Sequence, residues 1–241
     1  MNMQKIEDHL FTLWINAVQS YVIPWGVKLR RAKRQRNVGP PSVEFQKRLC
    51  DLGIDADSIW WGPMTLFPRK AIVLIDAIEK NPPRAVLEVG SGSSTPLLTA
   101  LSKKHGFQLI SLENHRGSFN YVRGLLDSTP GGMEVNLINT GFVRHRYPDG
   151  KSYRWYDVDL GSYGLKFDFV VIDGPMGTLV GRNGALPEIA PHLAEIHSIY
   201  LDDSQREHEQ NCIAEWEKYF PSLVVESIDG CRGMSRLHLA R

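Results

Sequence analysis

From residue 85 onward, short apolar runs alternate with longer stretches of mixed polarity. Five of these runs are rich in residues that favour strands, and they lie at 85–89, 107–113, 134–140, 167–173 and 198–203. Helical patterns are found at 70–80, 96–104, 117–127 and 184–194. This alternation of strand and helix predicts a doubly wound parallel sheet.

Two segments depart from this rhythm. The stretches 222–228 and 234–240 flank the sequence DGCRG, which is typical of a β-hairpin. Residues 141–166 are a long, aromatic and basic insertion, which we expect to form a hairpin or flap over one end of the sheet. The predicted fold class is therefore α/β, with a Rossmann-like, mostly parallel seven-stranded sheet, an antiparallel C-terminal hairpin and an N-terminal helical arm.

The N-terminal region is amphipathic, because residues 10–27 carry no charge and their polar side chains recur at helical spacing. The polar set is Thr12, Asn16, Gln19 and Ser20, opposite the apolar set of Leu10, Trp14, Ala17, Val18, Tyr21 and Trp25. A basic run follows, made of Lys28, Arg30, Arg31, Lys33, Arg34 and Arg36. We divide the chain into this arm with its connector, residues 1–60, and a main domain, residues 61–241.

Two interpretations of the arm stay open. Amphipathic helices usually face a protein core, so we expect the helix to pack on the main domain while the basic run stays in solvent. The alternative is peripheral membrane contact, with Trp14 and Trp25 at the level of the headgroups and the cations on anionic lipid.

Composition narrows the class of protein. The chain has 241 residues, of which 42% are hydrophobic and 23% charged, so neither wholesale disorder nor a multi-span membrane protein is expected. Cys50, Cys212 and Cys231 form no C-x-x-C motif, which favours a reducing compartment. Acidic residues precede the apolar N-terminal stretch, unlike in a signal peptide. We expect a cytoplasmic protein, with the inner membrane surface as an option.

A glycine-rich loop follows the first predicted strand, in the sequence EVGSGSST. Gly90 and Gly92 allow a tight turn and a close approach to a ligand, and Thr95 is expected to cap the next helix. A dinucleotide site would have a third glycine where Thr95 stands. Glu88 before the glycines fits a ligand with a positive charge and an amino group, although it could instead brace the loop. Glu113, at the end of the second strand, is placed to accept both hydroxyls of a ribose.

VLEVGSGSST followed by LISLE resembles the class I S-adenosylmethionine-dependent methyltransferases, over roughly residue 72 to the C-terminus. FDFVVIDGPMG and IYLDDSQREHE are similar to the glycan and small-molecule O-methyltransferase branches. The resemblance implies S-adenosylmethionine as cofactor. The residues that it implies for cofactor binding are Glu88, Gly90, Ser91, Gly92, Ser94, Thr95, Glu113, Asn114 and Asp173.

Asp173, Asp202 and Asp203 end the fourth and fifth predicted strands, so they should converge at the rim of the cofactor site as catalytic residues. Three neighbouring carboxylates repel one another, and a divalent cation such as Mg²⁺ would relieve this repulsion and bind two substrate hydroxyls. In the alternative, Asp203 caps a helix, Arg206 neutralises one acid, and Asp173 acts as a general base. Candidate acceptor-binding residues are Tyr153, Arg154, Tyr156 and Arg182.

The leading functional hypothesis is methyl transfer from S-adenosylmethionine to a hydroxyl of a sugar, glycan or other small polyhydroxyl acceptor. A nicotinamide dehydrogenase is disfavoured by Glu88 and Thr95. RNA methylation would use the basic run on phosphates, but no N-P-P-Y-like tetrapeptide follows the fourth strand, so nucleic acid is not the expected partner. The remaining alternative is a non-catalytic, membrane-attached protein with a methyltransferase fold.

Overall fold

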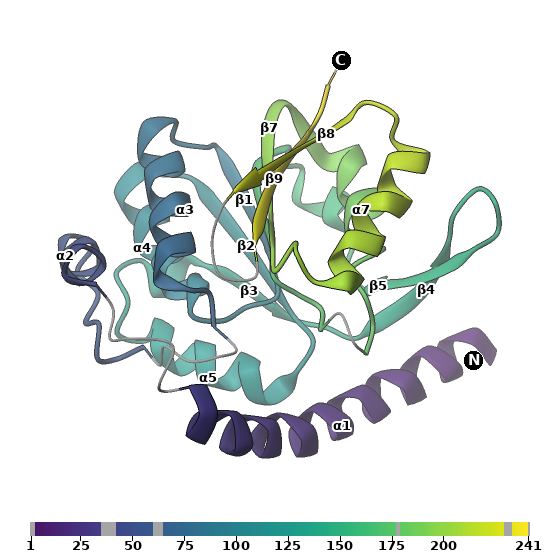
Figure 1. Ribbon diagram of the computed structural model, residues 1–241, viewed down its shortest axis with the longest axis horizontal. Coiled ribbons are helices and arrows are strands. Elements are labelled where there is room, and N and C mark those ends of the chain that lie inside the picture. Colours follow the sequence, from purple (N-terminus) through teal and green to yellow (C-terminus); the bar gives the residue numbers. More distant parts are fainter. Residues whose placement is uncertain (1–2, 35–41, 60–64, 177–178, 229–232, 241) are drawn as a thin grey trace.

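The computed structural model describes residues 3–34, 42–59, 65–176, 179–228 and 233–240, and it describes the side chains of the first helix only as far as Ser20. These residues form a seven-stranded sheet between helices, with a separate two-stranded hairpin beside it (Figure 1). The strand order in the sheet is β3-β2-β1-β6-β7-β9-β8.

Five strands of the sheet run parallel, and the last two form an antiparallel edge. Their bounds are β1 Ala85–Val89, β2 Gln108–Glu113, β3 Asn136–Asn139, β6 Phe167–Ile172, β7 Leu193–Asp202, β8 Leu223–Ile228 and β9 Met234–Leu239. Every residue of β1 is buried, because packed elements cover both faces of the sheet at this strand. The predicted fold class is confirmed, including the C-terminal hairpin.

Two apolar cores flank the sheet. One core joins helices α2, α3 and α4 to the face that presents Val86, and the other joins α6 and α7 to the face that presents Leu87. The helices on the domain are α2 Val43–Asp51, α3 Pro68–Lys80, α4 Ser94–His105, α5 Arg116–Leu126, α6 Ala185–Ile189 and α7 Glu207–Tyr219. The segment expected to be only a connector therefore contains a short helix, α2, which Ser42 caps by accepting from the Phe45 backbone N–H.

The predicted helix over residues 184–194 is wrong in its second half. α6 ends at Ile189, a 3₁₀ turn follows at Ala190–His192, and β7 begins at Leu193. Pro191 has no backbone N–H, so it cannot donate the hydrogen bond that would continue the α-helix. The strand predicted to start at residue 198 consequently starts earlier.

The long insertion forms the expected hairpin, from β4 Phe142–Arg146 and β5 Ser152–Tyr156 in antiparallel pairing. Phe142, Trp155 and Tyr156 are buried, and they join the core on the face of α6 and α7. The hairpin is thus anchored by aromatic side chains, and it closes one side of the domain (Figure 1).

Helix α1, Met3–Arg34, crosses below the main domain and contacts β4 (Figure 1). It packs largely through its polar side chains. The Thr12 hydroxyl accepts from the Phe142 backbone N–H at 3.1 Å, and Asp8 pairs with Arg154 at 2.8 Å. Trp14, expected on a packed or membrane-facing side, is 54% exposed. The helix therefore lies on the domain, but with the polar face inward where an apolar face was expected.

The side chains of Trp25 and of the basic run lie outside the described residues. Within the helices that the structure does describe, none is long and apolar enough to span a membrane.

Candidate functional site

A pocket opens at the carboxyl ends of β1, β2, β6 and β7. β1 and β6 are neighbours at the point where the strand order reverses, and ligands of open α/β sheets bind at such a point. Four loops supply most of the walls, at residues 90–93, 113–115, 173–176 and 202–203. Gln19 of α1 and Tyr156 of β5 are among the other residues that line the pocket.

The backbone of the glycine loop lies directly against the backbone of the loop that follows β6. Gly90 has a φ of +91°, and a Cβ atom added there would lie 2.5 Å from the backbone nitrogen of Gly174. Only glycine fits this position, as the sequence suggested. A Cβ atom at Gly92 would meet nothing within 4 Å, so the backbone there faces open space beside the pocket.

Glu88 lies beneath the glycine loop and does not line the pocket. It is fully buried and accepts hydrogen bonds from Ser94 at 2.5 Å, Thr95 at 2.8 Å and Ser111 at 2.5 Å. Burial raises the pKa of its carboxyl, against these three hydroxyls. Glu88 braces the loop, which was the alternative to ligand binding.

Ser94 and Thr95 are also buried below the pocket, not exposed to it. The Thr95 hydroxyl accepts from the Gly92 backbone N–H at 2.9 Å and donates to Glu88. α4 begins at Ser94 after Ser93, so Thr95 is not the helix cap that was expected. The three residues Glu88, Ser94 and Thr95 hold the loop in shape, and Gly90, Ser91, Gly92 and Ser93 face the ligand space.

Glu113 does line the pocket, at the end of β2. One carboxylate oxygen accepts from the backbone N–H groups of Asn114 and His115, at 2.8 and 2.7 Å, and the other accepts from Ser91 at 3.0 Å. Burial raises the pKa of Glu113 to about 7, although these three donors oppose the shift. The carboxylate is therefore held in one orientation across from the glycine loop.

Two further side chains on the same wall were not predicted from the sequence to belong to the site. Gln19 of α1 accepts from the Asn114 side chain at 2.9 Å, and both residues are buried against the pocket. His115 lines the pocket and contacts Ser20 at 3.1 Å. Gln19 was predicted only as part of a polar helix face, because its partner lies 95 positions away in the chain.

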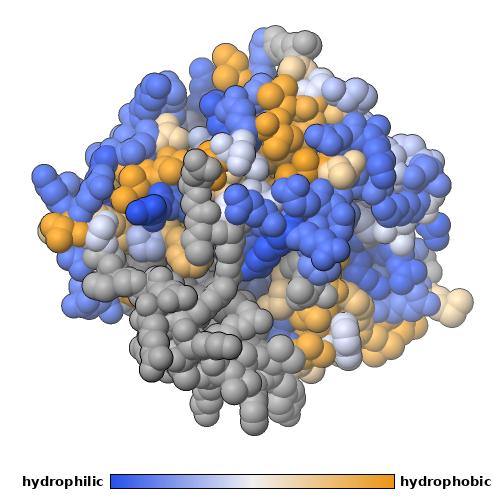
Figure 2. All heavy atoms as spheres, in the orientation of Figure 1, coloured by the Kyte–Doolittle hydropathy of each residue, from blue (hydrophilic) through white to orange (hydrophobic). Residues whose placement is uncertain are grey.

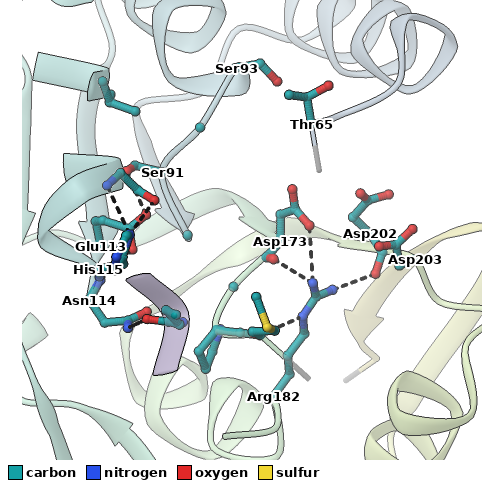
Figure 3. Close-up of a pocket in the computed structure, with 18 of the residues that line it drawn as sticks. Thr65, Ser91, Ser93, Glu113, Asn114, His115, Asp173, Arg182, Asp202 and Asp203 are labelled. Carbon is teal, nitrogen blue, oxygen red and sulfur yellow. Dashed lines mark hydrogen bonds and ion pairs between the residues drawn. The ribbon is translucent and has the colours of Figure 1, made fainter. Parts of the chain in front are cut away.

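The three aspartates converge as predicted, with ligand oxygens that all lie within 4.8 Å of one another. Each one pairs with a different cation. Arg182 is 3.2 Å from Asp173, Lys70 donates to Asp202, and Arg206 pairs with Asp203. Lys70 also lies 3.6 Å from Asp203. Figure 3 shows the Arg182 guanidinium between Asp173 and the Asp202–Asp203 pair.

Lys70 belongs to the first turn of α3 and is buried, and nothing in the sequence marked it as a partner of an aspartate 132 positions later. Despite the cations, burial and then the charge of Asp202 raise the pKa of Asp173 well above its ordinary value. Burial and Asp202 also raise the pKa of Asp203. The oxygens suit a hard cation such as Mg²⁺, but three protein cations already relieve the repulsion that suggested one.

Arg182 and Tyr156 are the two predicted acceptor residues that the structure brings to the pocket. The Arg182 guanidinium donates to the carbonyls of Asp202 at 2.7 Å, Asp173 at 2.5 Å and Pro175 at 3.3 Å. It therefore fixes the ends of β6 and β7. The Tyr156 hydroxyl is buried in the pocket wall and has no hydrogen-bond partner among the described residues.

Tyr153 and Arg154, the other two predicted acceptor residues, lie away from this pocket. The Tyr153 hydroxyl donates to Glu188 at 2.6 Å. Arg154 pairs with Asp8 and lies 3.6 Å from the centre of the Phe11 ring, so it holds α1 against β5. Arg154 and Tyr156 are two residues apart and share one face of β5, but only Tyr156, at the end of the strand, reaches the pocket.

No protein-family model matches the chain, and no curated protein matches its sequence. Solved structures do resemble its fold. SAH-bound methyltransferase PaMTH1 from Podospora anserina is 15% identical, with 89% of this chain and 95% of that one covered and a TM-score of 0.54.

The O-methyltransferase from Bacillus cereus, in complex with SAH, is 13% identical, with 93% and 97% covered and a TM-score of 0.55. TomG, an O-methyltransferase from Streptomyces achromogenes in complex with SAM, is 9% identical, with 87% and 95% covered and a TM-score of 0.53. This chain therefore has the class I methyltransferase fold that its glycine loop suggested.

Proposed function

We propose that this protein transfers a methyl group from S-adenosylmethionine to a hydroxyl of a small polyhydroxyl or glycan acceptor. The observation that carries the proposal is one pocket that joins the glycine loop and Glu113 to the aspartates at the ends of β6 and β7. The similarity in fold to methyltransferases bound to SAH or SAM supports it.

Residues 90–93 and Glu113 form the proposed cofactor half of the pocket. Open space beside Gly92 admits a ligand close to the backbone, and Glu113 is oriented to accept the two hydroxyls of a ribose. Bound S-adenosylmethionine would supply an electrophilic methyl group on its sulfonium. The chain needs no covalent intermediate, because alignment of donor and hydroxyl suffices for an in-line transfer.

Asp173 and Tyr156 face the other half, where the acceptor would bind. Asp173 is part-exposed, and its side chain can orient the acceptor hydroxyl and take its proton. The buried Tyr156 hydroxyl gains a partner if an acceptor or cofactor oxygen enters the pocket. The carboxylates of this half can accept hydrogen bonds from an acceptor rich in hydroxyl groups.

The aspartate cluster is compatible with two forms of this reaction, one without a divalent ion and one assisted by it. Because Lys70, Arg182 and Arg206 already pair with the three acids, we favour transfer without a divalent ion. The second form is metal-assisted, and it is favoured by the spacing of the three carboxylates, whose oxygens lie within 4.8 Å. There Asp173, Asp202 and Asp203 would hold the ion, which would lower the pKa of the bound hydroxyl.

Calorimetry with S-adenosylhomocysteine tests the cofactor half. We expect Glu113→Ala to weaken binding by about 1–3 kcal/mol, as when a hydrogen bond to a charged group is lost. Glu134→Ala, at an exposed acid, is the matched control and should leave the affinity unchanged. If the wild-type protein does not bind, the proposed function fails.

Transfer of a labelled methyl group to a panel of polyhydroxyl acceptors tests the second half, with and without chelator. Full activity in chelator, with an Asp173→Asn variant that binds cofactor but turns over about a hundredfold more slowly, supports the ion-free form. Loss of activity in chelator that Mg²⁺ restores would favour the metal-assisted form. Label found only on acceptor nitrogen would contradict O-methylation.

A further inference from the structure

An exposed apolar stripe runs along the outer side of α1. Its members are Met3, Ile6, Leu10, Leu13 and Trp14, with exposed fractions of 75%, 39%, 58%, 54% and 54%. At about 100° per residue they fall within one face of the helix, and Ala17, also exposed, lies on the same face. Figure 2 shows hydrophobic side chains at the lower right edge of the molecule, where this part of α1 lies in Figure 1.

Contacts on the opposite face fix which side of α1 is exposed. Ile15 is fully buried in the core, Asp8 pairs with Arg154, and Gln19 binds Asn114. The helix could not turn its apolar stripe inward without breaking these contacts. The stripe is thus held outward by specific polar bonds, in contrast to the usual arrangement in which the apolar face of a surface helix packs on the core.

The same helix then becomes strongly basic. The nine residues from Lys28 to Arg36 carry six positive charges, and the helix backbone continues through Arg34. An apolar face that includes a tryptophan, followed by a cationic segment, is the composition of helices that lie in the interface of an anionic bilayer. The basic segment supplies charge complementarity that an apolar stripe alone lacks.

We propose that α1 docks this protein on an anionic lipid surface. The stripe inserts among the acyl chains near the headgroups, and the basic segment binds the lipid charges. A second copy of the chain fits the stripe less well. Specific dimers bury roughly 20–30 residues on each side, and the stripe has five large apolar residues beside a segment of like charges.

Flotation of the full chain with phosphatidylcholine vesicles, with and without phosphatidylglycerol, tests the proposal. We expect binding to the anionic vesicles, weakened about fivefold for each cation neutralised, which corresponds to about 1 kcal/mol. The double variant Leu13→Glu with Trp14→Glu should lower the partition coefficient by about tenfold or more, because two inserting side chains become charged. Both side chains are exposed, so circular dichroism should show an unchanged fold.

Ile196→Glu is the matched control, since Ile196 is exposed on β7 and distant in sequence from α1. It should float like the wild type. Failure of the wild type to bind anionic vesicles, or an equal loss in Ile196→Glu, would overturn the proposal. A stable dimer that the double variant dissociates, without vesicle binding, would assign the stripe to a second copy, and binding to RNA in place of vesicles would assign the basic segment to nucleic acid.

A measurement of cofactor affinity distinguishes a failure of this proposal from a failure of the proposed function. Leu13→Glu with Trp14→Glu should retain binding of S-adenosylhomocysteine, because neither residue lines the pocket.

Discussion

The two halves of the pocket hold their acids in different ways. On the cofactor side, Glu88 and Glu113 accept hydrogen bonds from hydroxyls and backbone N–H groups, and within the described residues neither forms an ion pair. On the acceptor side, each aspartate is paired with a lysine or arginine. Neutral donors orient a carboxylate without balancing its charge, whereas buried cations balance that charge. The acceptor side should therefore be the more sensitive of the two to the loss of a cation.

Removing the central cation of the acceptor side should have the largest effect. Arg182→Met leaves Asp173 without its cation and frees the carbonyl of Asp202, so we expect the free energy of unfolding to fall by about 3–5 kcal/mol. Arg206→Met is the control, because Arg206 is 40% exposed and its loss should cost about 1 kcal/mol or less. Urea denaturation of both variants measures the difference. Equal losses of stability in the two variants would contradict the expectation that the buried Arg182 contributes more than the part-exposed Arg206.

A substitution at the contact between the two halves should come next. Gly90→Ala places a Cβ atom against Gly174 in a backbone conformation that disfavours side chains, so we expect about 2–4 kcal/mol of destabilisation. Gly92→Ala points into open space, and its stability should change by less than about 1 kcal/mol while cofactor affinity falls. Thermal unfolding and calorimetry separate the two effects. A fully stable Gly90→Ala protein would show that the loops can move apart.

The smallest effect concerns the pH response of the cofactor side. The pKa of Glu113 is raised to about 7, and hydrogen bonds from ribose hydroxyls are stronger to the ionised carboxylate than to the neutral acid. Affinity should therefore be highest above pH 7 and fall as the pH drops through it, by at most about tenfold between pH 8 and pH 6.

Adenosine is the suitable probe for this titration, because it has the ribose hydroxyls but no amino-acid part that titrates near pH 7. Glu113→Gln should bind weakly and with no slope over the same range. A slope that survives in Glu113→Gln would assign the titration to another group, such as His115.

The central strands β1, β2 and β6 could be predicted because they are buried on both faces, and their sequences are nearly continuous apolar runs. The glycine loop and the convergence of Asp173 with Asp202 also followed from sequence, since parallel strands end at the same edge of a sheet. The second half of the helix predicted at 184–194 is wrong, because Pro191 cannot donate the backbone hydrogen bond that would continue α6.

Most partners of the charged side chains could not be predicted, although one alternative placed Arg206 beside an acid, and Arg206 does pair with Asp203. Glu88 was expected to bind ligand, but it accepts hydrogen bonds from Ser111 on the neighbouring strand and from two hydroxyls in the first turn of α4. Lys70 reaches Asp202 across 132 positions, and only the packing of α3 against the sheet brings them together. Sequence periodicity predicts two faces of α1 but not which one packs inward, because Asp8, Thr12 and Gln19 bind partners that lie far away in the chain.

Through the hydrogen bond between Gln19 and Asn114, one face of α1 forms part of the pocket wall, while its opposite face is exposed to solvent. Thermodynamic linkage then imposes a reciprocal rule. If a surface bound to the outer face of α1 shifts Gln19 and changes the affinity for a ligand in the pocket by some factor, that ligand changes the affinity for the surface by the same factor. A measurement of vesicle binding with and without S-adenosylhomocysteine would read this coupling directly, and a ratio of one would show that the two faces of the helix act independently.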